Sequence, residues 1–305
     1  MKGNKRFLIL NADDFGASAR VNAAVRKAHQ EGVLTSASLM VTEAGWQEAV
    51  EIARQTPTLG VGLHLVTTFD HALLPAAEIP HLIGRAGHLD RNPLRAGLRY
   101  AFSHAAQAEL KREMEAQFAR FAETGLPWSH ADGHQHFHMH PAIWDHFLTL
   151  CDRYGVHRLR IPHEEIGPHF RSGGDGPNLN TAAALCFRLL RRRNLRVLRA
   201  CESLGGRRPF LCDRVYGTLQ SGNMNAAYVQ ALLGRLGGGA NEIYFHPGTD
   251  HARPLPAGAQ TEDVRDVEMQ ALLDPAVRAR IESLGLCVGR YADIEAVMIE
   301  EGYRE

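Results

Sequence analysis

The sequence predicts an α/β protein: a distorted (β/α) TIM-like barrel with seven or eight mostly parallel strands and long βα loops. Short apolar runs alternate with longer amphipathic runs along the whole chain, as expected for a parallel sheet wrapped by helices. The length of 305 residues suits one barrel, and no change of composition marks a linker. We therefore expect a single domain over residues 1–305.

Eight segments have the composition and length of strands. Each is a short run rich in apolar residues and bounded by polar or turn-forming residues, and the last of them is weak. Their order along the chain, each followed by a helical segment, favours parallel pairing. The expected strands are residues 7–10, 36–41, 60–66, 128–132, 157–161, 209–215, 242–246 and 286–289.

The segments between them have apolar residues at helical spacing. Pro275 is expected to break one helix, because proline lacks the amide hydrogen that a helix interior needs. Residues 70–102 and 163–180 exceed ordinary connections and are expected to be long loops. The expected helices are residues 19–31, 44–55, 105–123, 141–154, 181–199, 225–236, 262–284 and 293–300.

Composition excludes several classes of protein. The 34 basic and 34 acidic residues balance, so no global charge indicates a nucleic-acid partner. No apolar run approaches the ~18 residues of a membrane span, and the apolar stretch after Arg6 is too short for a secretion signal. Five scattered cysteines argue against a disulfide framework. We expect a soluble, cytoplasmic protein.

Acids and histidines follow or end several of the expected strands. Asp13 and Asp14 follow the first strand after two intervening residues, His64 lies in the third strand, and His246 ends the seventh. The carboxyl ends of barrel strands converge, so these side chains are expected to meet at one rim. Singly, each has a simpler explanation as a helix cap or a hydrogen-bonded core residue. Together they form a set suited to one divalent metal.

A histidine cluster follows the fourth expected strand. His134, His136, His138 and His140 occupy every second position and would share a face of an extended backbone. They cannot all bind one ion, so the others would orient ligands or contact substrate; a histidine-rich loop without metal is the alternative. Arg160 ends the next strand and could clamp a carboxylate or hydroxyl group, with an ordinary surface ion pair as the alternative.

Four motifs in a fixed order resemble the YdjC-like carbohydrate deacetylases. The resemblance runs nearly end to end, and the ordered set is more specific than any one motif. It implies a metal-dependent hydrolase of a linear amide bond that removes acetyl groups from N-acetylated sugars on a distorted barrel. The motifs are NADDFG at residues 11–16, GLHL at 62–65, DGHQHFHMHP at 132–141 and HPG at 246–248.

The resemblance also implies roles for individual residues. Asp14, His64 and His134 would hold the metal, Asp13 would be the general base and His246 the candidate general acid. Mixed imidazole and carboxylate ligation suits zinc, manganese, iron or cobalt better than magnesium. Family members are often described with magnesium, so we expect one divalent ion, magnesium or zinc. Arg160, His136 and His138 remain candidates for substrate binding.

The chain most resembles the branch associated with hopanoid biosynthesis, especially over residues 11–40. That resemblance implies N-acetylglucosamine linked to a hopanoid lipid as the substrate. Soluble chito-oligosaccharides are the alternative substrates. Two other functions remain open: a different metallohydrolase such as a phosphoesterase, and a non-catalytic glycan-binding barrel that retains the metal site. A homo-oligomer is also left open.

One segment suggests contact with a membrane. Residues 188–208 place eight arginines among leucines, and a basic amphipathic helix can lie on an anionic membrane surface. The alternative is an ordinary outer helix with a solvated face. If the substrate is lipid linked, this helix or the loops near residues 73–98 would approach the inner face of the membrane.

Overall fold

The structure is a computed structural model that describes residues 5–84, 87–176, 178–203, 208–248 and 264–303. Parts of four predicted segments lie outside these ranges: residues 85–86, 177, 204–207 and 262–263. Within the described ranges the strands form one sheet in the order β6-β5-β4-β3-β2-β1-β8-β7, with β9 beside β1. The strands are β1 (Arg6–Phe15), β2 (Ser36–Leu39), β3 (Gly60–Leu65), β4 (Ala131–Gly133), β5 (Arg158–Leu159), β6 (Phe210–Leu211), β7 (Arg214–Tyr216), β8 (Gly239–Phe245) and β9 (Cys287–Val288).

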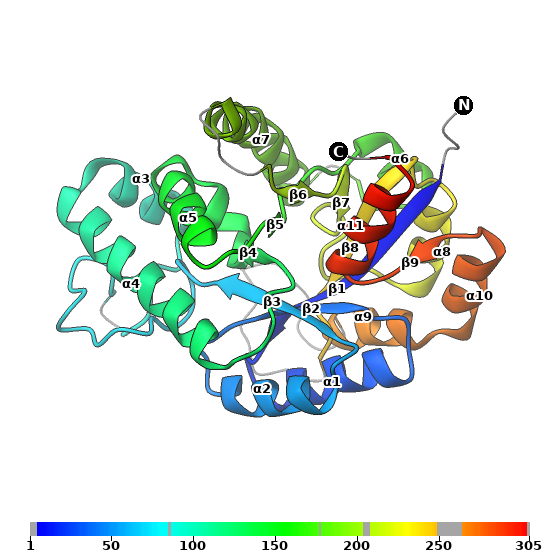
Figure 1. Ribbon diagram of the computed structural model, residues 1–305, viewed down its shortest axis with the longest axis horizontal. Coiled ribbons are helices and arrows are strands. Elements are labelled where there is room, and N and C mark those ends of the chain that lie inside the picture. Colours follow the sequence, from blue (N-terminus) through cyan, green and yellow to red (C-terminus); the bar gives the residue numbers. More distant parts are fainter. Residues whose placement is uncertain (1–4, 85–86, 177, 204–207, 249–263, 304–305) are drawn as a thin grey trace.

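The sheet is parallel at every pair of named strands and curls into a partial barrel surrounded by helices (Figure 1). The predicted distorted α/β barrel is confirmed. The expected single strand over 209–215 is wrong, because it divides into β6 and β7 around Asp213. The Asp213 carboxylate accepts the Ala240 N–H at 2.8 Å, which turns the chain toward β8. Among the described residues no pairing joins β6 to β7, so the barrel is open there.

Several helices begin where the sequence supplies start signals. The Ser18 hydroxyl caps α1, Asn92 precedes Pro93 at the start of α3, and Asp274 precedes Pro275 at the start of α10, so the predicted break at Pro275 is confirmed. The helices are α1 (Ala19–Gln30), α2 (Trp46–Gln55), α3 (Pro93–Phe102), α4 (His104–Glu123), α5 (Pro141–Arg153), α6 (Ile166–Arg171), α7 (Leu179–Ser203), α8 (Ala226–Leu233), α9 (Val264–Leu273), α10 (Pro275–Ser283) and α11 (Tyr291–Glu300), with a 3-10 segment, η1 (His134–Met139).

Both expected long loops contain a helix, so those two predictions need correction. Helix α3 lies within residues 70–102, and α6 lies within residues 163–180. Neither buries a stripe of large apolar residues: α3 buries Ala96, Gly97 and Tyr100. Their apolar periodicity is therefore weak, although the cap of α3 was present in the sequence.

No helix in the described part of the chain is long and apolar enough to cross a membrane.

Strand β1 separates two hydrophobic clusters. Leu8 and Leu10 face the larger cluster, which is shared with the outer helices, whereas Phe7 and Ile9 face a smaller cluster inside the barrel. Side chains alternate along a strand, so the next odd-numbered positions continue the interior face. The polar residues of β1 therefore enter the barrel interior above an apolar floor.

Candidate metal centre

Interior-facing positions of neighbouring strands bring a polar layer together. Asn11 and Asp13 extend the interior face of β1, and strand pairing sets the corresponding positions of the other strands beside them. Most side chains of this layer are fully buried and bond to one another. The layer contains Asn11, Asp13, Ser38, His64, Asp132, Arg160, Glu242 and Tyr244.

The backbone at Asp14 is left-handed, with φ at 63°. This region is uncommon for a residue other than glycine and costs on the order of 1 kcal/mol or more. The register between β1 and β2 also shifts between Ala12 and Phe15. Because the alternation breaks here, the neighbouring carboxylates of Asp13 and Asp14 both serve the same rim instead of pointing to opposite faces of the sheet.

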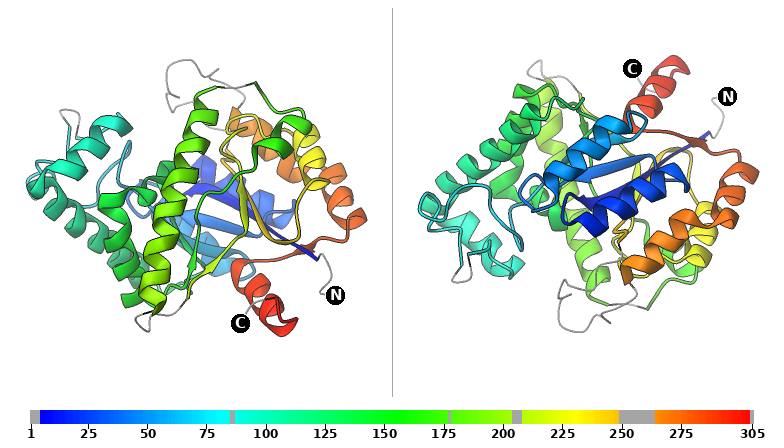
Figure 2. Two further views of the ribbon diagram at one scale, coloured as in Figure 1. Left: turned by 90° about the horizontal axis from the view of Figure 1, so that it is seen from above. Right: turned by 90° about the horizontal axis from the view of Figure 1, so that it is seen from below.

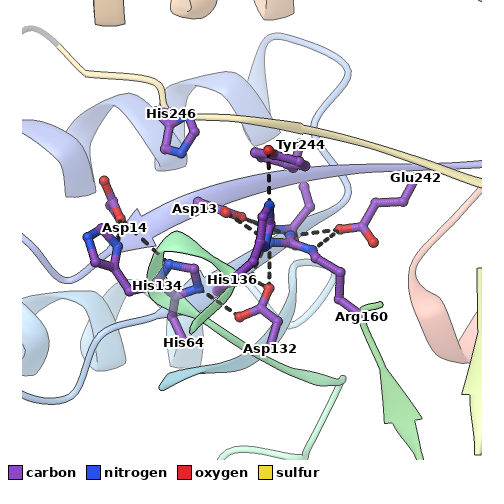
Figure 3. Close-up of polar contacts among 12 residues, drawn as sticks. Asp13, Asp14, His64, Asp132, His134, His136, Arg160, Glu242, Tyr244 and His246 are labelled. Carbon is purple, nitrogen blue, oxygen red and sulfur yellow. Dashed lines mark hydrogen bonds and ion pairs between the residues drawn. The ribbon is translucent and has the colours of Figure 1, made fainter. Parts of the chain in front are cut away.

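Asp14, His64 and His134 converge at this rim (Figure 3). Their ligand atoms lie within 4.8 Å of one another, and all three side chains are buried. Asp14 Oδ1 lies 3.7 Å from His64 Nε2 and 3.2 Å from His134 Nδ1. The other carboxylate oxygen, Oδ2, accepts a hydrogen bond from Arg265 at 2.6 Å. One carboxylate and two imidazoles form a donor set that fits a divalent ion such as zinc.

Each of the two imidazoles is held on its other side by a second carboxylate. His64 Nδ1 lies 2.7 Å from Asp132 Oδ1, and His134 Nε2 lies 3.3 Å from Asp70 Oδ2. Burial lowers the pKa of His64, but the charges of Asp132 and Asp13 outweigh it and raise the pKa to about 9. Such carboxylates fix ring orientation and tautomer in metal sites. The sequence did not indicate Asp70 as a site residue, because it lies in an expected long loop and belongs to no motif.

A second group of possible ligands, Asp13, His64 and Asp132, overlaps the first. At this second group the guanidinium of Arg160 already supplies the positive charge that a metal ion would bring. Arg160 Nη1 lies 2.8 Å from Asp13 Oδ2 and 2.7 Å from Asp132 Oδ2, so the two carboxylates face a guanidinium. We therefore place the candidate ion at Asp14, His64 and His134.

Arg160 is fully buried, contrary to both expectations for it. Its guanidinium donates to both oxygens of Asp13 at 2.8 Å and to Glu242 at 2.8 Å. These acids raise the pKa of Arg160 in spite of its burial, so it remains cationic. The interpretations of Arg160 as a substrate clamp or a surface ion pair are corrected: it lies behind Asp13 and positions it.

The histidine cluster is not extended. Gln135 and His136 both have φ at 54°, and η1 turns through the cluster, so the expected shared face is wrong. His138 is fully buried and its Nε2 bonds the Arg160 carbonyl at 2.9 Å, which corrects its place as a substrate contact. His140 caps α5, accepting from the Ala142 N–H at 3.2 Å.

His136 lies beside Tyr244 of the interior polar layer. Its Nε2 lies 3.0 Å from the Tyr244 hydroxyl, and Tyr244 in turn donates to Thr218 at 3.0 Å. The buried Nδ1 has no hydrogen-bond partner within the described ranges. Two consecutive left-handed residues here store strain, which is typical of functional sites. His136 thus remains a candidate for contact with a ligand.

His246 follows the last residue of β8 and points toward the centre that contains Asp14 (Figure 3). Its Nδ1 lies 3.6 Å from Glu268 Oε2, and the same carboxylate accepts the His246 backbone N–H. Burial lowers the pKa of His246, but Glu268 outweighs it and the net shift is upward. Glu268, from α9, also accepts the Gly222 N–H at 2.7 Å. No sequence signal pointed to Glu268.

One family model and several named relatives match this chain. A family model described as YdjC-like protein matches residues 7–283. The chain is 30% identical over 293 residues to a chitooligosaccharide deacetylase of Serratia marcescens, covering 95% of this chain and 100% of that protein. It is 44% identical over 149 residues to a carbohydrate deacetylase of Brevibacillus brevis, covering 49% of this chain and 57% of that protein. The latter match therefore spans little more than half of that relative.

One solved structure shows the same fold. A putative cellobiose-phosphate cleavage protein of Enterococcus faecalis V583 superposes with a TM-score of 0.68 and 22% sequence identity. The match covers 95% of this chain and 99% of that one. At this identity the likeness concerns the fold alone.

Proposed function

This chain belongs to the YdjC-like protein family, and from that premise we propose that it is a metal-dependent hydrolase that removes the acetyl group from an N-acetylated sugar. The observation that carries the proposal is the buried group of Asp14, His64 and His134 beside the oriented carboxylate of Asp13. The names of the relatives, carbohydrate deacetylase and chitooligosaccharide deacetylase, support the same reaction class.

In this proposal Asp14, His64 and His134 hold one divalent ion, magnesium or zinc. When bound, the ion supplies a Lewis acid that polarises the acetamide carbonyl and acidifies water. Asp132 and Asp70 keep the two imidazoles oriented from behind. The imidazole donors favour zinc over magnesium.

Asp13 acts as the general base in the proposed reaction. Its Oδ1 accepts bonds from both Asn11 and Arg160, whereas Oδ2 accepts from Arg160 Nη1. A carboxylate oxygen has two lone-pair positions, so Oδ2 keeps one for the proton of the attacking water. Arg160 fixes the direction of that lone pair, which general-base catalysis requires.

His246 acts as the general acid. As the water oxygen bonds to the acetyl carbon, the C–N bond breaks and the departing sugar nitrogen needs a proton. The raised pKa of His246 favours its protonated form near neutral pH. Glu268 lies on the Nδ1 side, which leaves Nε2 to donate the proton. The products are acetate and an amino sugar.

His136 is proposed to contact the sugar. Its buried Nδ1 has no partner in the part of the chain that the structure describes, and a buried polar group without a partner costs about 1–3 kcal/mol. A sugar hydroxyl would satisfy that nitrogen. Tyr244 holds the other nitrogen and fixes the ring.

For the natural substrate we propose N-acetylglucosamine linked to a hopanoid lipid, handled by a cytoplasmic enzyme that forms a single domain. The lipid is what a resemblance of residues 11–40 to the hopanoid-associated branch would imply. The relatives' names support soluble chito-oligosaccharides as the alternative. Both substrates share the acetamide on which the chemistry acts.

The test is release of acetate by purified protein from diacetylchitobiose and from an N-acetylglucosaminyl hopanoid. Release from either supports the deacetylase, and the ratio of kcat/KM values identifies the preferred substrate. A protein that binds both sugars without releasing acetate would be the glycan-binding barrel instead. Hydrolysis of a phosphate ester with no acetate release would identify a phosphoesterase.

A further inference from the structure

The outward face of α7 carries large apolar side chains in contact with solvent. Leu179, Leu185 and Leu189 are 84%, 48% and 64% exposed, and Phe170 on the neighbouring α6 is 41% exposed. Leu185 and Leu189 are four residues apart and share one face of the helix. The inward face is distinct: Ala184, Asn194 and Leu198 are buried there. In Figure 2 (left) α7, in yellow-green, crosses the front of the molecule outside the sheet.

The same helix is strongly basic. Six arginines lie between residues 188 and 199, and no Asp or Glu occurs between residues 176 and 201. Arg188, Arg192 and Arg196 are exposed and succeed one another at four-residue spacing, in line with Leu185 and Leu189. The outward face of α7 therefore combines leucines in its first half with uncompensated positive charge in its second half.

A recess between α6 and α7 adds guanidinium groups from three places in the chain. Its volume is about 460 Å³, and its basic lining residues are Arg171 of α6, Arg188 of α7 and Arg235, which follows α8. Of its two acids, Glu165 pairs with Arg214 at 3.1 Å and Glu164 accepts the Leu219 N–H at 2.9 Å. Guanidinium groups bind phosphate oxygens in paired hydrogen bonds. The recess therefore suits a phosphate group.

We propose that this face of α6 and α7 docks on an anionic membrane surface. Phe170, Leu185 and Leu189 enter the boundary between headgroups and acyl chains, and the arginines pair with lipid phosphates. Hereafter we call Phe170, Leu185, Leu189, Arg192 and Arg196 the docking face. A second copy of the chain fits it poorly, because a two-fold contact would set the arginines of one copy against those of the other.

The inward face of α7 connects the docking face to the candidate metal centre. The ring of Phe187 packs edge-on against His136, with 5.1 Å between centroids, and Asn194 donates to the Met139 carbonyl at 3.1 Å. One helix, about 10 Å thick, therefore separates the membrane surface from the segment that contains His134 and His136. Docking would bring a lipid-linked sugar close to the centre. This use of the surface rests on the proposed function, whereas membrane binding does not.

Vesicle flotation of the full chain tests the proposal. Vesicles of phosphatidylcholine mixed with phosphatidylglycerol are compared with vesicles of phosphatidylcholine alone. The wild type should float with the anionic vesicles, bind neutral ones about tenfold more weakly, and be released by salt. The double variants Leu185→Ser/Leu189→Ser and Arg192→Glu/Arg196→Glu should each bind anionic vesicles at least about tenfold more weakly.

Matched variants control for general loss of apolar or basic surface. Val288→Ser/Ile299→Ser removes apolar side chains that are 38% and 51% exposed on β9 and α11, and Arg26→Glu reverses a charge on α1; both should float like the wild type. Unchanged thermal unfolding of all variants shows that they are folded. Flotation of the docking-face variants at wild-type levels, or no flotation of the wild type, overturns the proposal.

Two further outcomes separate this proposal from others. Light scattering that shows a wild-type dimer broken by Leu185→Ser/Leu189→Ser would identify a second copy as the occupant and overturn membrane docking. Acetate release from diacetylchitobiose, measured in parallel, reports on the proposed function alone. Flotation without acetate release would contradict the deacetylase but leave the docking face supported. Acetate release without flotation would support the deacetylase and contradict the docking face.

Discussion

Both terminal nitrogens of Arg160 bond the two carboxylate oxygens of Asp13 at 2.8 Å, in a part of the barrel closed to solvent. The same guanidinium contacts Asp132 and Glu242. One buried cation thus contacts three acids and aligns the carboxylate that we propose as the base. Stability and reactivity of the centre are coupled through this residue.

Arg160→Met should destabilise the protein by roughly 3–5 kcal/mol, because it leaves buried carboxylates without their counter-charge. Urea unfolding measures the loss. The matched control is Arg290→Met, since Arg290 pairs with Asp293 near the surface and such pairs contribute about 0–1 kcal/mol. Equal effects of the two substitutions would contradict a buried role for Arg160.

Asp13→Asn should retain the metal and lower kcat by ~10² to 10⁴, a barrier increase of roughly 3 to 5 kcal/mol. The amide keeps the shape of the side chain but cannot take the proton. Acetate release and elemental analysis on the same sample separate turnover from metal content. Asp145→Asn, at an exposed acid on α5, is the control. If Asp13→Asn instead lost its metal and regained activity when metal was added back, Asp13 would be the metal ligand and Asp14 the base.

Glu268→Gln should lower the pKa of His246, because it removes the carboxylate that raises that pKa against burial. If His246 is the acid, activity falls as His246 loses its proton. The basic limb of the kcat profile should therefore move to lower pH. Glu282→Gln, at an exposed acid on α10, should leave the profile unchanged. A lower kcat with the limb unmoved would indicate that Glu268 only supports the fold.

The raised pKa of Glu164, which lies away from the metal centre, predicts that stability depends on pH. Burial raises its pKa from 4.5 to about 7, although the N–H groups of Leu219, Gly217 and Thr218 oppose the shift. Between these values the native state holds a proton that the unfolded state has lost, so this residue lowers stability as pH rises through the window.

Glu164→Gln removes that penalty. The gain in its free energy of unfolding over the wild type should be larger at about pH 8 than at about pH 5, by at most about 3 kcal/mol. Urea unfolding at both pH values gives the difference. The exposed Glu282→Gln should show no such change. A difference of opposite sign would mean that Glu164 is held as a carboxylate in the folded protein.

The sequence predicted the barrel because its signals are periodic and local. The buried β1 and the apolar faces of the outer helices follow from residue spacing alone. The division of the strand over 209–215 was not predictable, because it depends on a contact between Asp213 and Ala240. Helices α3 and α6 were missed for a related reason, since each buries few large apolar side chains.

The candidate site was predictable in its residue types but not in its geometry. Asp14, His64 and His134 lie at strand ends, which placed them at one rim. The left-handed backbone at His136 could not be inferred, so the cluster was expected to be extended. Partners such as Asp70 and Glu268 come from a loop and a distant helix, and only the fold brings them near.

The metal content of His64→Ala and His134→Ala, measured together with acetate release, tests the central claim most directly. Both variants should purify with little bound divalent ion and lose acetate release, whereas His104→Ala, at the exposed start of α4, should match the wild type in both. Chelation of the wild type should abolish acetate release, and added divalent ion should restore it. Full acetate release by either site variant without bound metal would contradict the account.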